Sequence, residues 1–273
     1  MDRRISGQTT CNSGEKLSNG DSNLDISISD AVRDKLRLMR DRIEEGDPAS
    51  KVTDDATLQR FLYARELNVE KACEMFAKYR KWRQTCVPLG YIPETMVCNE
   101  VKQNFVYMQG FDKMGRPIMV LLLARHIACE SSIEDFRRFV VYAFDKMSAS
   151  ATRGQTKFSI IADFDDWAYK NVNLRGTIAA VQTLQDFYPE RLGKVYLIHR
   201  PYIFWAAWKI VSPFIDKVTR QKIVFTDDKR VKETLLKDID ENQLPEIYGG
   251  KLPLVTIQDS VVPNWPPVTS SQE

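Results

Sequence analysis

Apolar residues in the first third of the chain recur with the spacing of amphipathic helices. Between residues 29 and 46, apolar side chains fall on one helical face and a glycine ends the segment. Those side chains are Val32, Leu36, Met39 and Ile43. Residues 53–68 and 69–86 repeat the same spacing. The pattern predicts a helical bundle over residues 29–90.

The pattern changes after residue 90, where short apolar runs alternate with helical segments. Four runs are rich in β-branched residues and bounded by glycine, proline or charge, which is typical of strands. They cover residues 116–124, 157–164, 194–199 and 221–227. Apolar strands separated by helices predict an α/β fold with a mixed, mostly parallel sheet over residues 91–253. We expect crossover helices on one face of this sheet and a separate apolar helix over the other.

That apolar helix is predicted at residues 201–215, which are hydrophobic on nearly every side. One stripe on its helical wheel consists of Ile203, Ala207, Ile210 and Phe214, and a second consists of Phe204, Trp208, Val211 and Ile215. Residues 204–215 rise only about 18 Å as a helix, which is well short of a bilayer. Two alternatives remain, an ordinary buried core helix and a movable lid over an apolar cavity.

Composition and charge are those of an ordinary globular protein. The 273 residues are 43% hydrophobic, enough for one large domain or for a small domain beside a larger one. Lys and Arg total 39 against 37 Asp and Glu, so the net charge of +2 argues neither for nor against nucleic acid, and we expect no nucleic-acid partner. The five cysteines contain no C-x-x-C pair, which favours reduced thiols and a cytoplasmic address.

The two ends of the chain are expected to lie outside the folded units. Residues 1–28 have too few large apolar groups to offset the entropy of ordering, so we expect a disordered tail. Residues 254–273 contain a proline-rich stretch and are expected to form a surface extension. The sequence has no recognisable secretory signal and no segment long enough to span a bilayer, which predicts a soluble protein.

Motifs for catalysis and metal binding are mostly missing. The chain contains no phosphate-binding glycine loop, nucleophile elbow, H-E-x-x-H or EF-hand loop. His126 and His199 each end an apolar strand, where a lone histidine is usually structural. Asp163, Asp165 and Asp166 follow another strand, and we interpret them as a capping turn rather than a magnesium site. No metal site is expected, and an α/β enzyme using Asp163, Asp165 or His199 remains an alternative.

A lipid cavity would account for the excess of apolar surface. A soluble carrier must hold acyl chains in a dry cavity, because each methylene exposed to water costs about 0.8 kcal/mol. The helix at residues 201–215 would close that cavity with its inner stripe. In an open state Phe204, Trp205 and Trp208 would enter the membrane interface, which aromatic side chains favour, while Lys209 reaches toward headgroups.

Five stretches of the chain occur in the order found in one known family. They are DDATLQRFLYAREL (54–67), FDKMGRPI (111–118), YPERLGKVYLI (188–198), SPFIDKVTRQKIVF (212–225) and LPEIYGG (244–250). Together they resemble the CRAL-TRIO family, especially its yeast-type phosphatidylinositol transfer proteins. The resemblance implies a helical bundle beside a sheet lobe that encloses a hydrophobic lipid pocket closed by a gate helix. The gate residues would be Ile203, Phe204, Trp205, Ala207, Trp208, Ile210, Val211 and Phe214.

The resemblance also implies a set of headgroup contacts. Arg65, Glu190, Thr219 and Lys222 fall on the positions that contact the phosphoinositol headgroup in such proteins. Arg65 and Lys222 would meet the phosphate with charge-assisted bonds, and Thr219 would donate its hydroxyl. Glu190 would orient Lys222 or accept hydrogen bonds from the inositol ring.

One part of the expected pocket departs from the family pattern. Where phosphatidylcholine-binding members carry hydroxyl side chains and tyrosines, this chain has Phe158, Ile160 and Met119. With Leu121, these residues are the predicted pocket lining. We therefore expect a phosphoinositide-class ligand rather than a choline lipid.

The sequence as a whole predicts a lipid-binding and transfer protein and not an enzyme. It would exchange phosphatidylinositol and a second hydrophobic lipid at membranes and present phosphatidylinositol to lipid kinases, as a cytoplasmic monomer that binds membranes transiently. A bound lipid would take the place of a cofactor. One alternative is a carrier of a tocopherol-, retinoid- or sterol-like hydrophobe. Another is an interaction module built on the basic-aromatic sequence KYRKWR (78–83). This sequence could instead face a membrane or form a solvated bundle surface, and we favour the solvated surface.

Overall fold

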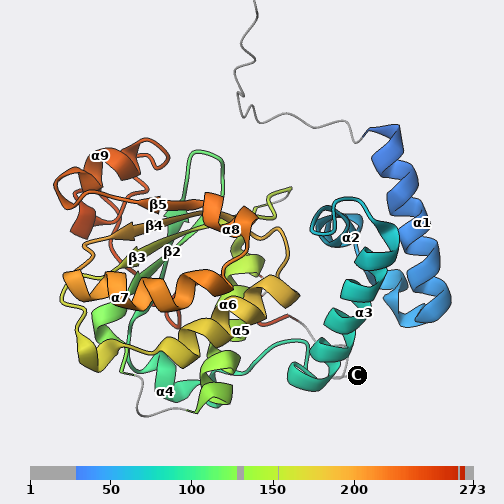
Figure 1. The fold of residues 1–273 in the computed structure, drawn as a ribbon, viewed down its shortest axis with the longest axis horizontal. Helices are drawn as coiled ribbons and strands as arrows, with labels where there is room; N and C mark the ends of the chain where they lie inside the picture. The colour runs from blue at the N-terminus through green and yellow to red at the C-terminus, as the bar shows by residue number, and fades with distance from the viewer. Residues whose placement is uncertain (1–28, 128–131, 153, 264, 268–273) are drawn as a thin grey trace, which may run out of the picture.

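The computed structural model combines helices with one five-stranded sheet, and it describes residues 29–127, 132–152, 154–263 and 265–267 (Figure 1). The predicted tail at residues 1–28 lies outside these ranges, as do the last six residues of the predicted C-terminal extension. The helices are α1 (Asp30–Gly46), α2 (Asp55–Tyr63), α3 (Val69–Cys86), α4 (Cys98–Val101), α5 (Ile133–Ser150), α6 (Leu174–Phe187), α7 (Tyr202–Val211), α8 (Lys217–Gln221) and α9 (Val231–Leu236). The strands are β1 (Val106–Phe111), β2 (Pro117–Leu122), β3 (Phe158–Asp163), β4 (Leu192–Ile198) and β5 (Ile223–Phe225).

Helices α1, α2 and α3 pack together as a bundle beside the sheet lobe (Figure 1). Side chains cap two of them: Asp54 accepts a hydrogen bond from the backbone of Thr57 at 2.7 Å, and Asn68 accepts one from Lys71 at 3.0 Å. The apolar faces of the three helices meet in one buried cluster that includes Met39, Phe61 and Phe76. The helical spacing in the sequence thus corresponds to a real apolar interface.

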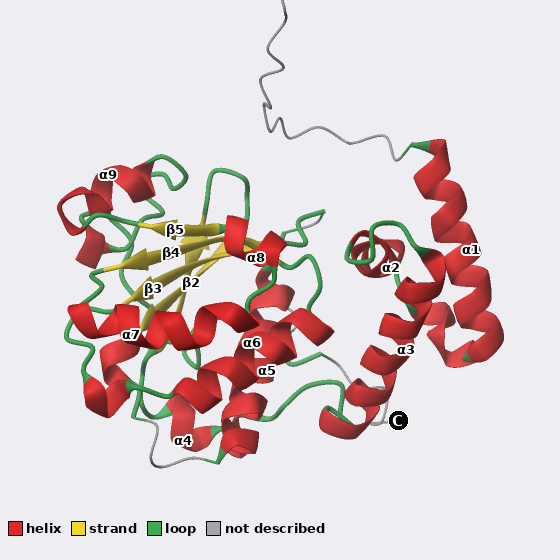
Figure 2. Ribbon diagram, in the orientation of Figure 1, coloured by secondary structure: helices red, strands yellow, loops and turns green. Residues whose placement is uncertain are grey.

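The sheet has the strand order β1-β2-β3-β4-β5 (Figure 2). Strand β1 pairs antiparallel with β2, and the other neighbours are parallel. This confirms the predicted α/β fold with a mixed, mostly parallel sheet. The apolar runs located β2 to β5 but not β1, because Gln109 and Gly110 interrupt its apolar pattern and its register shifts between Met108 and Phe111.

Helices α5, α6 and α7 all cover the same face of the sheet. Strands β2 to β5 are neighbours in sequence order, so every crossover moves in one direction, and right-handed crossovers then place their helices on one face. On that face Ala162 and Leu197 pack against Phe204 of α7. The expectation that the apolar helix covers the opposite face is therefore wrong, because α7 is itself part of the crossover between β4 and β5.

The opposite face is covered by α9 and the turns that follow it. Leu235 and Leu244 from this segment pack against Ile161 of β3 in a second buried cluster. The hydroxyl of Tyr196 donates to Asp238 at 2.6 Å and fixes the segment to β4. Since the described side chains close this face, a ligand cavity against the sheet has to lie on the first face.

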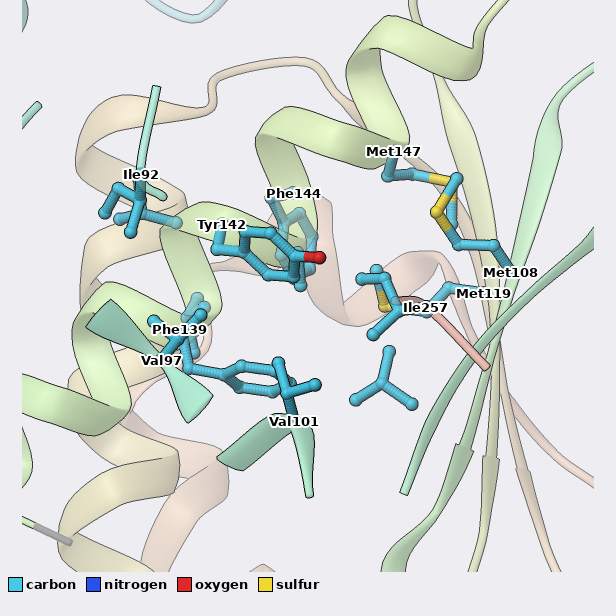
Figure 3. Packing of buried hydrophobic residues seen from close by; sticks show 14 of the residues in the cluster. Ile92, Val97, Val101, Met108, Met119, Phe139, Tyr142, Phe144, Met147 and Ile257 are labelled. Atoms are coloured by element: carbon cyan, nitrogen blue, oxygen red, sulfur yellow. The ribbon is translucent and has the colours of Figure 1, made fainter. Parts of the chain in front are cut away.

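The largest buried cluster lies between α5 and the strands β1 and β2 (Figure 3). Figure 3 shows Met147 of α5 pointing toward Met108 and Met119 on the neighbouring strands. This part of the first face is therefore filled by the side chains of α5. On this face, the described residues leave space for a ligand toward β3, β4 and β5.

Polar and aromatic contacts join the bundle to the sheet lobe. Arg83 of α3 donates to Asp145 of α5 at 2.6 Å, and the hydroxyl of Tyr188 donates to the same carboxylate at 2.7 Å. Beside them the rings of Trp82 and Phe187 stack with centroids 4.1 Å apart. Burial raises the pKa of Asp145, although Arg83 and Tyr188 act in the opposite direction. The junction is thus a packed interface with a mostly buried ion pair.

Candidate functional site

An apolar cavity of about 680 Å³ lies between the sheet and the helices α6 and α7. Its apolar walls include Phe158, Ile160, Val195 and Leu197 from the sheet, Leu174, Val181 and Leu184 from α6, and Phe204, Trp208, Val211 and Ile215 from α7 and the turn after it. Small-molecule sites measure about 300–1,000 Å³, whereas an ordinary core holds few voids larger than a water molecule. Helix α7 is therefore more than a core helix, because it covers a space that the protein's own side chains leave open.

Helix α7 and the turn that follows it present apolar side chains in two directions. The side chains that face the cavity are Phe204, Ala207, Trp208, Val211 and Ile215. Trp205, Ile210 and Phe214 face outward, with exposed fractions of 49%, 49% and 43%. Ile203 packs beside Phe204 against the sheet. The second predicted stripe thus faces the cavity, and part of the first faces the surroundings.

The helix is shorter than predicted and is held by side chains at its C-terminal end. It ends at Val211, and the chain continues as the 3-10 turn Ser212–Phe214, because Pro213 has no backbone N–H and disfavours an α-helix. Gln185 of α6 donates to the carbonyl of Phe214 at 3.1 Å and accepts from the backbone of Asp216 at 2.8 Å. This end of α7 is thereby fixed to α6.

The N-terminal end of α7 is held to the sheet by Arg200. Its guanidinium lies 5.3 Å from the ring centroid of Trp205 and 5.2 Å from that of Phe225. The same guanidinium donates to the carbonyl of Thr226 at 2.7 Å. Since Trp205 belongs to α7 and Phe225 to β5, Arg200 connects the helix to the edge strand.

Two of the four predicted pocket residues line the cavity. Phe158 and Ile160 on β3 contact it. Met119 and Leu121 are not among the lining residues, which corrects the prediction for these two positions. They lie on the same face of the sheet as Ile160, but on β2, where side chains of α5 already occupy the space.

The four predicted headgroup residues all border the cavity at its polar end. Lys222 Nζ lies 3.5 Å from Glu190 Oε2. The hydroxyl of Thr219 donates to Asp216 at 2.7 Å. Arg65 donates to the carbonyl of Ala64 and has no ion-pair partner in the part of the chain that the structure describes. The structure therefore places these four residues, from three separate segments of the chain, in the lining of one cavity.

A further arginine at this end, Arg191, was missed by sequence analysis. Its guanidinium donates to the carbonyl of Thr156 at 3.0 Å, and its Nε has no partner among the described residues. Burial lowers the pKa of Arg191, and burial together with the charge of Arg191 lowers the pKa of Arg60 to about 10. Of these two arginines, Arg191 lines the cavity, where it adds positive charge. The sequence feature that could have identified Arg191 is its position directly after Glu190 in YPERLGKVYLI.

The acidic and basic side chains that line the cavity differ in solvent exposure. Glu66, Asp186 and Asp216 also line it, but their side chains are exposed. Arg65, Arg191 and Lys222 are half-buried, and Glu190 is the only half-buried carboxylate among the lining residues that the structure describes. Inside the mouth the balance of charge is therefore positive.

The residues of the alternative enzyme site lie away from the cavity. Asp163 is buried, accepts from the Tyr248 hydroxyl at 2.8 Å and bonds to His199 Nδ1 at 2.8 Å. The backbone of Asp165 donates to the same carboxylate at 2.9 Å. His126 is buried between aromatic rings, and burial lowers its pKa to about 4. Across the described residues no group of three or more His, Cys, Asp or Glu side chains is placed to hold a metal ion.

Within the described ranges, no helix is both long enough and apolar enough to cross a bilayer.

Comparison with known sequences identifies related proteins. A sequence profile described as the CRAL/TRIO domain matches residues 101–250. A CRAL-TRIO domain-containing protein of Saccharomyces cerevisiae is 30% identical over 220 residues, which are 72% of this chain and 71% of that protein. The SEC14 cytosolic factor of Candida glabrata is 27% identical over 250 residues, 82% of this chain and 80% of that protein.

Some relatives are much longer. Protein real-time of Drosophila pseudoobscura pseudoobscura is 26% identical over 253 residues, which cover 86% of this chain but only 38% of that protein. The chain thus spans less than half the length of this relative. Among solved structures, the crystal structure of Sfh5 superimposes with a TM-score of 0.60 over 81% of this chain and 94% of that one. At 16% sequence identity this likeness is one of fold.

Proposed function

Because the chain belongs to the CRAL-TRIO family, a family of lipid-binding and transfer proteins, we propose that it carries phosphatidylinositol in the cavity and exchanges it at membranes. The observation that carries this proposal is the composition of the cavity. Its walls are apolar along β3, β4, α6 and α7, and its mouth holds half-buried cations. A phospholipid has the same division, with acyl chains that avoid water and a phosphate that carries negative charge.

The headgroup would bind where the cations converge. Arg65 and Lys222 would form charge-assisted hydrogen bonds to the phosphate, and Arg191 lies on the same wall. Glu190, 3.5 Å from Lys222, would hold that lysine in place and accept hydrogen bonds from inositol hydroxyls. The Thr219 hydroxyl would turn from Asp216 toward the lipid.

Helix α7 would act as the gate. Its inner side chains cover the cavity, and its outer side chains, Trp205, Ile210 and Phe214, are exposed apolar groups that suit the membrane interface. Lys209, also exposed, would extend toward headgroups. Opening of α7 at a bilayer would therefore exchange one apolar contact for another.

The ligand proposal extends to a second hydrophobic lipid that exchanges with phosphatidylinositol. Phe158 and Ile160 leave the β3 part of the cavity wall without hydroxyl groups, which does not favour a choline lipid. In the cell the protein would work in the cytoplasm as a monomer, bind membranes transiently and present phosphatidylinositol to lipid kinases. The bound lipid is the only ligand this function requires.

A ring-shaped hydrophobe is the second candidate. The cavity is rich in aromatic side chains, among them Phe144, Phe164 and Trp167, which suit a tocopherol-, retinoid- or sterol-like ligand. A neutral ligand of this kind would leave Arg65 and Arg191, which have no ion-pair partner among the described residues, without an anion. For that reason we prefer the phospholipid.

Alanine at Arg65 and Lys222 tests the headgroup assignment. Each hydrogen bond to a charged group contributes about 1.5–3 kcal/mol, so losing two should reduce phosphatidylinositol transfer between vesicles at least about 100-fold. The matched control is Lys35→Ala with Arg37→Ala, which removes the same charges from exposed positions on α1. Transfer by the Arg65/Lys222 variant at the rate of the control would refute the assignment.

A further inference from the structure

A second cavity, of about 760 Å³, lies between α3 and the C-terminal end of α6. Its apolar part consists of the buried Met75 and the stacked rings of Trp82 and Phe187. Its basic residues are Arg65, Lys71, Lys78 and Lys81, and its acidic residues are Glu74 and Asp186. We call this cavity the basic groove. Four cations face two carboxylates in it, so its local charge is positive.

The lysines of the basic groove form a row along one side of α3. Lys71, Lys78 and Lys81 are separated by seven and three positions, which places them on the same side of a helix over about 15 Å. All three are exposed, and none has an ion-pair partner among the residues that the structure describes. Like charges in such a row destabilise a helix slightly, and here no neighbouring carboxylate pairs with them.

The other cations of α3 are used in packing. Arg80 pairs with Asp47 at 3.1 Å, and Arg83 pairs with Asp145 at 2.6 Å. In the sequence KYRKWR, the arginines and the lysines therefore have different roles. Its arginines hold the helix to its neighbours, and its lysines remain available to a partner outside the chain.

The basic groove is continuous with the mouth of the lipid cavity. Arg65 and Asp186 line both. A bilayer that comes close enough to pass a headgroup into the cavity therefore also meets the edge of the groove.

We propose that the basic groove binds the anionic headgroups of the bilayer with which the protein exchanges lipid. The proposal rests on the proposed function, because it takes the cavity mouth to face a membrane. Charge complementarity supports it, since several anions are needed to match a row of lysines about 15 Å long. The outward side of α7 supplies apolar contact with the same bilayer, and the groove supplies the electrostatic attraction.

Binding to vesicles tests the groove without involving the lipid cavity. The variant replaces Lys71, Lys78 and Lys81 with alanine, which favours helix and leaves the cavity lining intact. Each lysine near an anionic surface contributes about a fivefold gain in affinity, so the triple variant should bind on the order of 100-fold more weakly. The probe is a vesicle of one-third phosphatidylserine and two-thirds phosphatidylcholine, and flotation measures the bound fraction. Added salt should weaken the wild type more than the variant.

A charge-matched control separates position from net charge. The variant Lys35→Ala, Arg37→Ala and Lys51→Ala removes the same number of charges from exposed positions on α1 and the turn after it, and it should bind nearly as well as the wild type. Equal vesicle binding by the two variants would overturn the proposal. So would full vesicle binding by the groove variant together with loss of binding to a polyglutamate peptide, because the partner would then be an acidic protein.

The outcome is also independent of the headgroup test. The amount of phosphatidylinositol bound to the groove variant, measured by mass spectrometry after extraction, should equal that of the wild type. Normal vesicle binding with a loaded cavity contradicts the groove proposal alone. Weak vesicle binding by the groove variant, with a cavity that never contains phosphatidylinositol in either protein, supports the groove and contradicts the proposed ligand.

Discussion

Replacing Arg200 with alanine should speed lipid exchange. Arg200 lies beside the rings of Trp205 on α7 and Phe225 on β5, which stack on each other with centroids 5.7 Å apart, and it donates to the carbonyl of Thr226 at 2.7 Å. These contacts join the N-terminal end of the proposed gate to the sheet. In our proposal, opening of α7 breaks these contacts, so removing them should favour the open state.

The size of the effect follows from the contacts. A cation–π contact at an exposed site contributes about 0.5–1 kcal/mol, and a hydrogen bond from a charged donor contributes about 1.5–3 kcal/mol. Arg200 keeps part of its surface in water, so we take about 2 kcal/mol for the whole set. A shift of that size in a two-state equilibrium raises a small open population about 30-fold.

The assay is release of a fluorescent phosphatidylinositol from loaded protein to excess acceptor vesicles in a single turnover. If opening limits release, the Arg200→Ala variant should release lipid about 30-fold faster than the wild type. The release rate of Arg200→Lys should lie between those of Arg200→Ala and the wild type. Arg230→Ala is the control, since Arg230 is an exposed arginine paired with Glu233. Unchanged or slower release from Arg200→Ala, with an unchanged melting temperature, would refute this account of the gate.

Two further predictions concern stability. Asp145→Asn should lower the free energy of unfolding in urea by about 3–5 kcal/mol, because Arg83 would remain mostly buried without its carboxylate, and a variant as stable as the wild type would contradict this. Burial lowers the pKa of His126 to about 4, below its value of about 6.5 in the unfolded chain, so its contribution is complete above pH 6.5 and is lost as the pH falls toward 4. Between pH 6.5 and pH 4, the wild type should therefore lose about 3 kcal/mol more stability than the His126→Phe variant. Identical pH profiles of the two proteins would contradict this.

The sequence pattern predicted the elements better than their placement. Helical spacing located α3 and α7, and apolar β-branched runs located β2 to β5. The side of the sheet that α7 covers depends on strand order and crossover handedness, which no single segment contains. Hydrophobic periodicity could show that α7 has two apolar sides, but not which side faces the cavity.

The sequence predicted four residues of the candidate site that lie in the family motifs. Arg65, Glu190, Thr219 and Lys222 come from three distant segments, and only the resemblance placed them together before the fold was known. Met119 and Leu121 were misplaced because the alternation of side chains along a strand gives the face, but not the position across the sheet. Arg191 was missed because an arginine next to a turn is usually a solvated surface group.

Native mass spectrometry of the protein purified from its own cells tests the central claim most directly. The account predicts a one-to-one complex with a phospholipid, with phosphatidylinositol among the bound species and lost in the Arg65→Ala and Lys222→Ala variant. An empty cavity, or phosphatidylcholine as the main bound lipid, would contradict it.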